Sequence, residues 1–299
     1  MERTSSWGSQ RLPFFAVSWS KIKCMRGCVV ALLSGRSAIF LSRAINTVTP
    51  IYGNLYSNFK GCECVQMKFG LIVPSSNVVM EAEYWKMAWG WATIHTARMR
   101  LEDITVKALE EMEKHLLDAA NRLADAGVDI IGYGCTSGSL FKGRDHPGEI
   151  EQNIENETGI PAVATSNAVI EVLDALEIEK ICVATPYIEE INGLERKFLE
   201  QNGKEVLRIK GLGIVRNREV GNKEPSAAYE LAKEVIVPET QGIFISCTNF
   251  RTLEVINRLE EELKVPVISS NTATFWAMMK KAGVKKRLEG YGKIFSEMT

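Results

Sequence analysis

The sequence predicts an α/β protein made of two similar lobes, each built on a parallel sheet. Three observations lead to this prediction: short β-rich runs alternate with longer helical patterns, the series restarts midway along the chain, and the two halves match in register. Strands that alternate with helices favour parallel sheets with helices on both faces. The length of 299 residues suits two domains of ordinary size.

The predicted elements begin at Met67. Apolar runs of strand length alternate with segments in which apolar residues recur at helical spacing. Gly127 and Gly159 mark helix ends and Pro147 marks a helix start, because these residue types favour those positions. The predicted strands are 69–74, 128–134, 161–165, 180–186, 242–246 and 265–270. The predicted helices are 105–127, 147–159, 166–178, 189–203, 226–237, 249–264 and 272–283.

The two halves show an internal duplication. When "KFGLIVP" is aligned with "KICVATP", Pro74 meets Pro186, and a cysteine lies 61 positions after each proline, at Cys135 and Cys247. The later segments "IPAVATSNA" and "VPVISSNTA" also match. A repeat of this kind predicts two Rossmann-like (flavodoxin-like) lobes related by a pseudo-twofold axis.

We expect the first lobe to span residues 67–178 and the second 179–299, with the C-terminal helix free to pack on the first lobe. Parallel sheets bind ligands beyond the carboxyl ends of their strands, and Cys135 and Cys247 both follow such ends. A pseudo-twofold arrangement would bring these ends face to face. The sequence therefore predicts an active site between the lobes.

Residues 1–66 differ from the rest of the chain, with eight Lys and Arg against two Asp and Glu. Three interpretations compete: a transit-type targeting peptide, a small metal site, or a translated stretch upstream of the true start. The metal site would use Cys24, Cys28, Cys62 and Cys64, but the spacing is not the usual pairing of zinc ligands. We favour the third interpretation, because Met67 opens a first strand, and expect an N-terminal extension that is poorly ordered and has no catalytic role.

Composition excludes several partners. The net charge of −1 does not favour binding to nucleic acid or to an anionic membrane. No run of about 18 apolar residues predicts a membrane span. Residues 67–299 hold three cysteines, Cys135, Cys182 and Cys247, which do not make a disulfide framework. We therefore expect a cytoplasmic protein, because disulfides are rare in that compartment.

The two repeated cysteines have surroundings that suit reactive thiols. Cys247 precedes the predicted helix 249–264, with Thr248 or Asn249 as its N-cap, and a helix N-terminus lowers the pKa of a thiol. Cys135 is followed by Thr136, Ser137 and a glycine, whose backbone N–H groups can bind a carboxylate. A single cysteine at a strand end is more often a buried core residue. The repetition at matching positions favours function, whereas Cys182 lies inside a predicted strand and is expected in the core.

Several motifs together resemble one known family. They are "VPSSN" (73–77), "GCTSGS" (134–139), "TPY" (185–187), "SCTNFRT" (246–252) and "VPVISSN" (265–271). In combination they resemble the maleate cis–trans isomerases, members of the aspartate/glutamate racemase superfamily that are related to arylmalonate decarboxylases. The resemblance extends from Met67 almost to the C-terminus. Arylmalonate decarboxylases typically keep one of the two cysteines, so the presence of both disfavours that branch.

The resemblance implies a mechanism without a cofactor. Cys135 would add to the double bond of maleate, the resulting single bond would rotate, and Cys247 would donate and accept a proton before fumarate leaves. This assignment conflicts with the helix argument, which makes Cys247 the more easily ionised thiol.

The resemblance also implies substrate-binding roles for Asn77, Tyr187 and Asn217. Each has a structural alternative: a helix cap, an aromatic residue between the lobes, and a turn residue, respectively. Thr136, Ser137, Thr248 and Asn249 complete the predicted binding set.

Two other functions remain open. The same thiols could serve a racemase or an arylmalonate decarboxylase-like enzyme, and a non-catalytic protein could keep the carboxylate-binding cleft without turnover. The expected partner in each case is a small dicarboxylate. The tryptophan-rich segment 83–92 is interpreted as core or as a subunit interface, with a lid over the cleft as the alternative. A homo-oligomer, dimer or tetramer, is also expected. His146 is expected to be exposed in a loop, and His95 and Arg98 to form a structural pair or to supply positive charge near the site.

Overall fold

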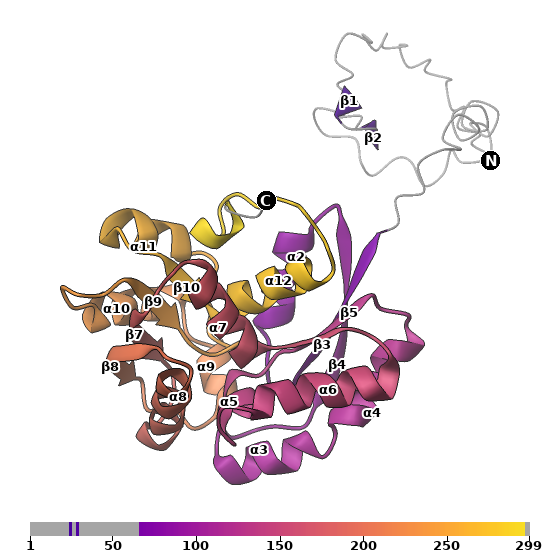
Figure 1. Ribbon diagram of the computed structural model, residues 1–299, viewed down its shortest axis with the longest axis horizontal. Helices are drawn as coiled ribbons and strands as arrows, with labels where there is room; N and C mark the ends of the chain where they lie inside the picture. Colours follow the sequence, from indigo (N-terminus) through magenta and orange to yellow (C-terminus); the bar gives the residue numbers. More distant parts are fainter. Residues whose placement is uncertain (1–23, 26–27, 30–65, 297–299) are drawn as a thin grey trace, which may run out of the picture. The chain divides into compact units, whose positions relative to one another are not determined.

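The computed structural model describes residues 24–25, 28–29 and 66–296 (Figure 1). All of the predicted strands and helices fall within the last of these ranges. No helix in the described ranges has both the length and the apolar character needed to cross a bilayer.

Two short strands precede the main α/β unit in the sequence. β1 (Cys24–Met25) and β2 (Cys28–Val29) pair antiparallel. They belong to one of the two compact units of the chain, Met1–Val65, and the other unit is Gln66–Thr299. The remaining expectations for residues 1–66, namely poor order, a metal site and the absence of a catalytic role, lie outside the described residues.

The first sheet of the main unit has four parallel strands in the order β4-β3-β5-β6. The central pair is buried on both faces, as expected for strands covered by helices on each side. Its strands are β3 (Met67–Pro74), β4 (Ala92–Met99), β5 (Ile130–Tyr133) and β6 (Ala162–Ala164).

The second sheet repeats this arrangement with the order β10-β9-β7-β8. In each lobe the first strand pairs with the second and third, and the third pairs with the fourth. The prediction of two similar lobes with parallel sheets is therefore confirmed. The strands are β7 (Lys180–Thr185), β8 (Glu205–Gly211), β9 (Gly242–Ile245) and β10 (Val267–Ser269).

The helices cover both faces of each sheet, and α7 and α12 pack together at the centre of the unit (Figure 1). α4 and α6 lie on one face of the first sheet, and α10 and α11 on one face of the second. The longer helices are α2 (Met80–Ala88), α3 (Val106–Glu113), α4 (Leu116–Asp125), α6 (His146–Thr158), α7 (Thr165–Ala175), α8 (Glu189–Gln201), α10 (Pro225–Val235), α11 (Ile256–Leu263) and α12 (Ser270–Lys281). The short ones are α5 (Thr136–Leu140), α9 (Asn217–Gly221) and the 3₁₀ helix η2 (Lys293–Phe295).

α12 joins the two lobes through an apolar surface. It contacts β10 of the second sheet and also β5, β6 and α7 of the first lobe. Its Phe275 ring lies 4.8 Å from the ring of Tyr84 and 5.3 Å from that of Phe69. This aromatic cluster buries the inner face of the first sheet against the C-terminal helix.

Two predicted helices differ from the observed ones. The predicted helix 105–127 is interrupted near His115, although its buried residues keep the same spacing on both sides, so the apolar pattern could not reveal the break. The predicted helix 249–264 begins only at Ile256. The backbone N–H groups of Thr252 and Leu253 donate to the Glu83 carboxylate instead of to carbonyl groups one turn earlier, which keeps this stretch out of the helix.

Candidate active site

The loops that follow the central strands of both sheets meet at one place in the main unit. The hydrogen bonds from Asn77 and Val78 in the first lobe to Thr248 and Asn249 in the second join them directly. The structure brings together all nine side chains predicted from the sequence, and each is buried. They are Asn77, Cys135, Thr136, Ser137, Tyr187, Asn217, Cys247, Thr248 and Asn249.

Cys135 lies directly before a helix that the sequence did not reveal. β5 ends at Tyr133, and Cys135 is the N-cap of α5, with its sulfur accepting a hydrogen bond from the Gly138 N–H at 3.3 Å. The Ser137 hydroxyl lies 3.8 Å from the same sulfur. Burial raises the pKa of the Cys135 thiol to about 11, and the contacts with Gly138 and Ser137 oppose this effect.

Cys247 occupies the equivalent position in the second lobe but has a different backbone. Its φ of 92° lies in the left-handed region, which is costly for a residue with a side chain. Its N–H donates to the Ser270 hydroxyl at 3.0 Å, and its sulfur accepts from the Asn249 N–H at 3.4 Å. The pKa of Cys247 is raised to about 12, chiefly by burial, with contacts from Asn249 and Tyr187 opposing this effect and the nearby Cys135 and Glu195 adding to it.

The expectation that a helix N-terminus activates Cys247 is wrong. The residues after Cys247 form turns up to Ile256, where α11 begins, so the dipole of that helix does not start at the thiol. The cysteine that caps a helix is Cys135, and its pKa is the less elevated of the two. The local structure thus removes the conflict between the helix argument and the assignment of attack to Cys135.

Asn77 combines the two roles considered for it. Its side-chain oxygen accepts hydrogen bonds from the N–H groups of Val79 and Met80 at the start of α2, as a helix cap does. Its side-chain nitrogen donates to the Thr248 hydroxyl of the other lobe at 3.0 Å. The cap thus fixes the amide in an orientation that directs its N–H₂ group toward the loop after Cys247.

Asn217 and Asn249 extend this contact between the lobes. Asn217 begins α9, and its side chain donates to the Ser76 hydroxyl at 2.9 Å. The Asn249 side chain donates to the Asn217 carbonyl at 2.7 Å and accepts from the Val78 N–H at 2.8 Å. Two amides from different loops therefore lie against the turn that carries Asn77.

The Tyr187 hydroxyl is one of several buried polar groups without a protein partner in the described part of the chain. It is buried and forms no hydrogen bond of ordinary geometry with any described residue, although buried hydroxyls are usually paired. It is nevertheless close enough to Cys247 to lower the pKa of that thiol. Burial and the two cysteines together raise the pKa of Tyr187 well above its usual range, so the hydroxyl keeps its proton and is available as a donor.

Sequence reasoning missed two residues that lie at this cluster. Ser270 bridges the lobes, because its hydroxyl accepts from both the Thr136 hydroxyl and the Cys247 N–H. Glu195 of α8 is fully buried and accepts a hydrogen bond from the Ser246 hydroxyl at 2.5 Å. Burial raises the pKa of Glu195 to about 8. Ser270 lies in the motif "VPVISSN" (265–271) and could have been found. Glu195 could not be distinguished by its sequence from the other charged residues of its helix.

The arginine and the histidines considered from the sequence lie around the site rather than in it. Arg98 donates to the Asn77 carbonyl at 2.6 Å and pairs with Glu81 at 2.7 Å, so it supports the turn from outside. His95 contacts the Thr93 hydroxyl. The expectation of an exposed His146 is wrong, since this ring is buried edge-on against Phe141.

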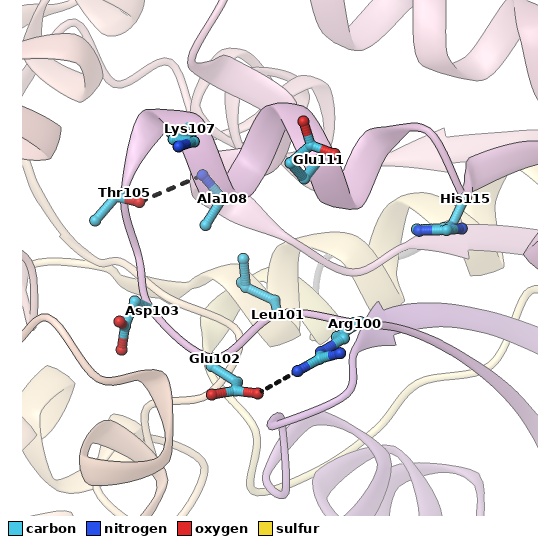
Figure 2. A pocket seen from close by; sticks show the side chains of 9 residues that line it. All are labelled: Arg100, Leu101, Glu102, Asp103, Thr105, Lys107, Ala108, Glu111 and His115. Atoms are coloured by element: carbon cyan, nitrogen blue, oxygen red, sulfur yellow. Dashed lines mark hydrogen bonds and ion pairs between the residues drawn. The ribbon is translucent and has the colours of Figure 1, made fainter.

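A surface groove of about 480 Å³ lies beside α3, between Arg100 and His115 (Figure 2). Its side chains carry mixed charge, and Arg100 forms an exposed ion pair with Glu102 at 3.0 Å. Neither Cys135 nor Cys247 lines this groove. One backbone contact connects the groove to the site residues, because the Asn217 N–H donates to the carbonyl of Glu102, which lines the groove.

Comparison with known proteins gives consistent matches over the main unit. Residues 69–295 match the family model described as arylmalonate decarboxylase. The maleate isomerase of Geobacillus stearothermophilus is 26% identical over 243 residues, covering 77% of this chain and 97% of that protein. The arylmalonate decarboxylase of Bordetella bronchiseptica is 27% identical over 231 residues, covering 76% and 96%. A maleate isomerase from Pseudomonas putida S16, solved with maleate, has a TM-score of 0.75 and 27% identity, covering 77% and 97%.

Proposed function

The chain belongs to the arylmalonate decarboxylase family, and from this premise we propose that it is a cofactor-independent cis–trans isomerase that converts maleate to fumarate. The observation that carries the proposal is the pair of buried thiols, Cys135 and Cys247, supplied by equivalent strand ends of the two lobes. Similarity to maleate isomerases, one of them solved with maleate, supports the choice of substrate.

The two thiols suffice to write a balanced reaction. The Cys135 thiolate adds to one alkene carbon of maleate, and Cys247 gives its proton to the other, forming a succinyl thioether with a single bond between the two carbons. Rotation about that bond places the carboxylates trans. The Cys247 thiolate then takes back a proton, the carbon–sulfur bond breaks, and fumarate leaves with Cys135 restored as the thiolate. Nucleophilic and acid–base catalysis are thus divided between the two lobes.

Neutral donors hold the substrate in this proposal. Backbone N–H groups at Thr136 and Ser137 and the hydroxyls of these residues face one carboxylate, and Asn77, Tyr187 and Asn217 face the other. Thr248 and Asn249 complete the site on the second lobe. The unpaired Tyr187 hydroxyl and the exchangeable amide contacts of Asn217 supply donors that a carboxylate can take over.

A second candidate is an arylmalonate decarboxylase-like or racemase reaction on an sp³ carbon. The family match and the 27% identity to the Bordetella bronchiseptica enzyme favour this alternative. The same two thiols would then add or remove a proton at one carbon from opposite faces.

Turnover of the full-length protein separates these candidates. We expect conversion of maleate to fumarate by the intact enzyme, its loss in Cys135→Ala and Cys247→Ser, and its retention in Cys182→Ala, which removes a buried thiol that lies inside β7. Absence of fumarate from the intact protein would refute the proposal. Release of CO₂ from an arylmalonate, or racemisation of aspartate or glutamate, would favour the second candidate, and saturable dicarboxylate binding without any reaction would indicate a binding protein.

A further inference from the structure

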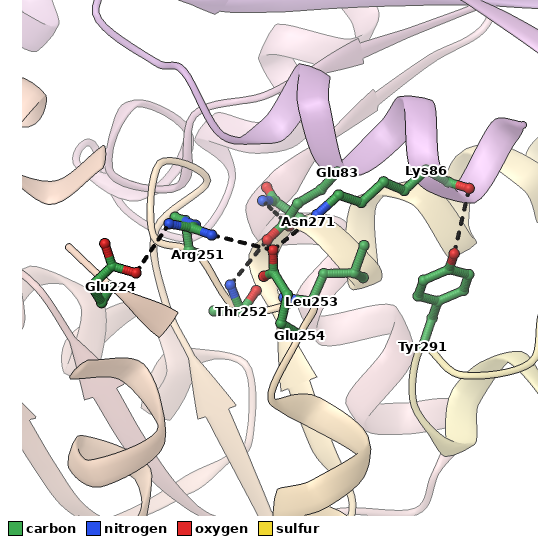
Figure 3. Close-up of polar contacts among 9 residues, drawn as sticks. All are labelled: Glu83, Lys86, Glu224, Arg251, Thr252, Leu253, Glu254, Asn271 and Tyr291. Atoms are coloured by element: carbon green, nitrogen blue, oxygen red, sulfur yellow. Dashed lines mark hydrogen bonds and ion pairs between the residues drawn. The ribbon is translucent and has the colours of Figure 1, made fainter. Parts of the chain in front are cut away.

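A buried carboxylate from the first lobe holds the loop that carries Cys247. Glu83 lies on α2 with 2% of its surface exposed. One of its oxygens accepts hydrogen bonds from the Thr252 and Leu253 N–H groups, both at 3.0 Å (Figure 3). The other accepts from the Asn271 side chain at 2.6 Å. All three donors belong to the second lobe.

Asn271 connects this carboxylate to the residue next to the thiol. Its side-chain nitrogen, which donates to Glu83, also donates to the Thr248 carbonyl at 3.2 Å. Both neighbours can only accept, so the amide must present its N–H₂ group to them. The chain of contacts therefore runs from Glu83 through Asn271 to Thr248, immediately after Cys247.

The loop needs an external partner of this kind. Residues between Cys247 and Ile256 do not form a helix, so the N–H groups of Thr252 and Leu253 lack carbonyl partners one turn earlier. Cys247 itself has a φ of 92°, and such a backbone persists only when its surroundings enforce it. Glu83 supplies the acceptor at one end of the loop, and Ser270 binds the Cys247 N–H at the other.

Stabilisation of the fold does not explain the presence of this charge. Burial raises the pKa of Glu83, and the three hydrogen bonds only partly offset it. A folded-state pKa above the unfolded value means that the folded protein holds the proton more tightly, so the ionised side chain costs stability at neutral pH. A neutral acceptor of the same size could receive the Thr252 and Leu253 N–H groups without the cost of a buried charge, which points to a role in positioning.

We propose that Glu83 is a positioning residue that fixes the Cys247–Leu253 loop and thereby aims the Cys247 thiol at the substrate. The role in turnover rests on the proposed function, whereas the effect on the thiol does not. Glu83 contacts neither thiol and acts through Asn271 and the loop backbone.

An exposed ion pair beside Glu83 provides a matched control. Lys86, on the same helix, pairs with Glu254 of the same loop region at 2.9 Å, with half of the lysine side chain exposed. Exposed pairs of this kind contribute little to stability. Lys86→Met therefore removes another contact between α2 and this region without removing the buried acceptor.

The decisive variant is Glu83→Gln, which keeps the shape but places an N–H₂ group against that of Asn271. Asn271 must then turn its oxygen toward Gln, which withdraws the donor from Thr248. We expect kcat for maleate to fall about tenfold or more with a small change in KM, because a misplacement of about 1 Å can cost on the order of 100-fold. The melting temperature should stay within about 4 °C of the wild type.

Alkylation of the two thiols by iodoacetamide, followed by peptide mass spectrometry, tests the positioning without turnover. In Glu83→Gln the ratio of Cys247 to Cys135 labelling should rise several-fold, and in Lys86→Met both this ratio and kcat should stay within twofold of the wild type. The proposal would be overturned if Glu83→Gln kept the wild-type labelling ratio and kcat. It would also be overturned if Lys86→Met changed both quantities as much as Glu83→Gln does. If Glu83→Gln does not fold, Glu83→Asp decides, since a carboxylate withdrawn by one methylene should shift the ratio in the same direction. A wild-type enzyme without isomerase activity would refute the function while the labelling ratio still decides the role of Glu83.

Discussion

Cys135 and Cys247 occupy equivalent positions in the duplicated fold but differ in their local structure. Cys135 caps α5 and receives the Gly138 N–H, whereas Cys247 has a left-handed backbone and is followed by turns. The pKa of Cys135 rises to about 11 and that of Cys247 to about 12. This difference supports the proposal that Cys135 attacks and Cys247 carries the proton.

The difference in pKa leads to a prediction for the ligand-free protein. Iodoacetamide should modify Cys135 faster than Cys247, because the pKa of Cys135 is the less elevated and the two thiols are similarly buried. Cys182, fully buried within β7, should react most slowly, and maleate should protect Cys135. Peptide mass spectrometry over time measures the three rates. Faster labelling of Cys247, or equal rates at all three thiols, would contradict this order.

Glu195 predicts a pH dependence of stability. Its pKa is raised to about 8 in the folded protein by burial, against an ordinary value of 4.5. The folded state therefore binds the proton more tightly, and the stability that this provides is complete below pH 4.5 and lost as the pH rises to 8. Relative to Glu195→Gln, the wild type should lose up to about 1.4 kcal/mol of unfolding free energy per pH unit in this window.

Urea unfolding at several pH values between 5 and 9 checks this expectation. Glu200→Gln, on the exposed side of the same helix, is the control and should run parallel to the wild type. Parallel curves for the wild type and Glu195→Gln would show that Glu195 does not titrate in this range.

At the scale of elements, the sequence predicts strands better than it predicts helix starts. Every predicted strand is present, because apolar runs bounded by Gly and Pro leave few alternatives. The edge strands β4 and β8 were not among the predicted strands, because their partly exposed faces interrupt the apolar run. The sequence did not reveal α5, since "TSGSL" has no helical periodicity and forms its helix where the Cys135 cap and surrounding burial permit it. The late start of α11 depends on Glu83, which lies 169 positions before Thr252 and could not be seen from local sequence.

Two glycines on neighbouring elements should respond in opposite ways to alanine. A methyl group on Gly211, at the end of β8, would overlap the Tyr187 carbonyl and the Asn192 side chain, whereas one on Gly193, inside α8, would meet no atom within 4 Å. We expect Gly211→Ala to destabilise by about 1–3 kcal/mol and to reduce turnover by moving Tyr187. Gly193→Ala should stabilise by up to about 1 kcal/mol. Chemical denaturation and the maleate assay measure both effects, and a neutral Gly211→Ala would contradict the tight contact at Tyr187.

At the scale of the whole molecule, the duplication was the most informative signal in the sequence. The equal spacing from Pro74 to Cys135 and from Pro186 to Cys247 predicts both lobes and the meeting of their strand ends. The contacts between the lobes could not be predicted in the same way. The hydrogen bonds from Thr136 to Ser270 and from Asn77 to Thr248 join residues more than 130 positions apart, and no periodic pattern encodes such pairs.

Two exposed tryptophans at the end of α2 lead to a prediction about assembly. Trp85 of α2 and Trp89, which directly follows this helix, are 39% and 82% exposed, while Trp91 of the same segment packs on Phe69. Large exposed apolar side chains that cluster often mark an interface. We predict a homo-oligomer that Trp85→Lys with Trp89→Glu converts to a monomer, measured by sedimentation velocity. Leu117→Glu, on α4, is the control for an isolated exposed apolar residue, and an unchanged sedimentation coefficient in the double variant would contradict the prediction.

The central claim is that one thiol bonds covalently to the substrate while the other moves the proton, and intact-protein mass spectrometry tests it most directly. Cys247→Ser, incubated with maleate and denatured in acid, should gain the mass of one maleate, with the added group on the peptide that contains Cys135. Cys135→Ala should gain none under the same conditions. An adduct on Cys247 in the Cys135→Ala variant, or turnover of maleate by a protein that lacks Cys135, would contradict the account.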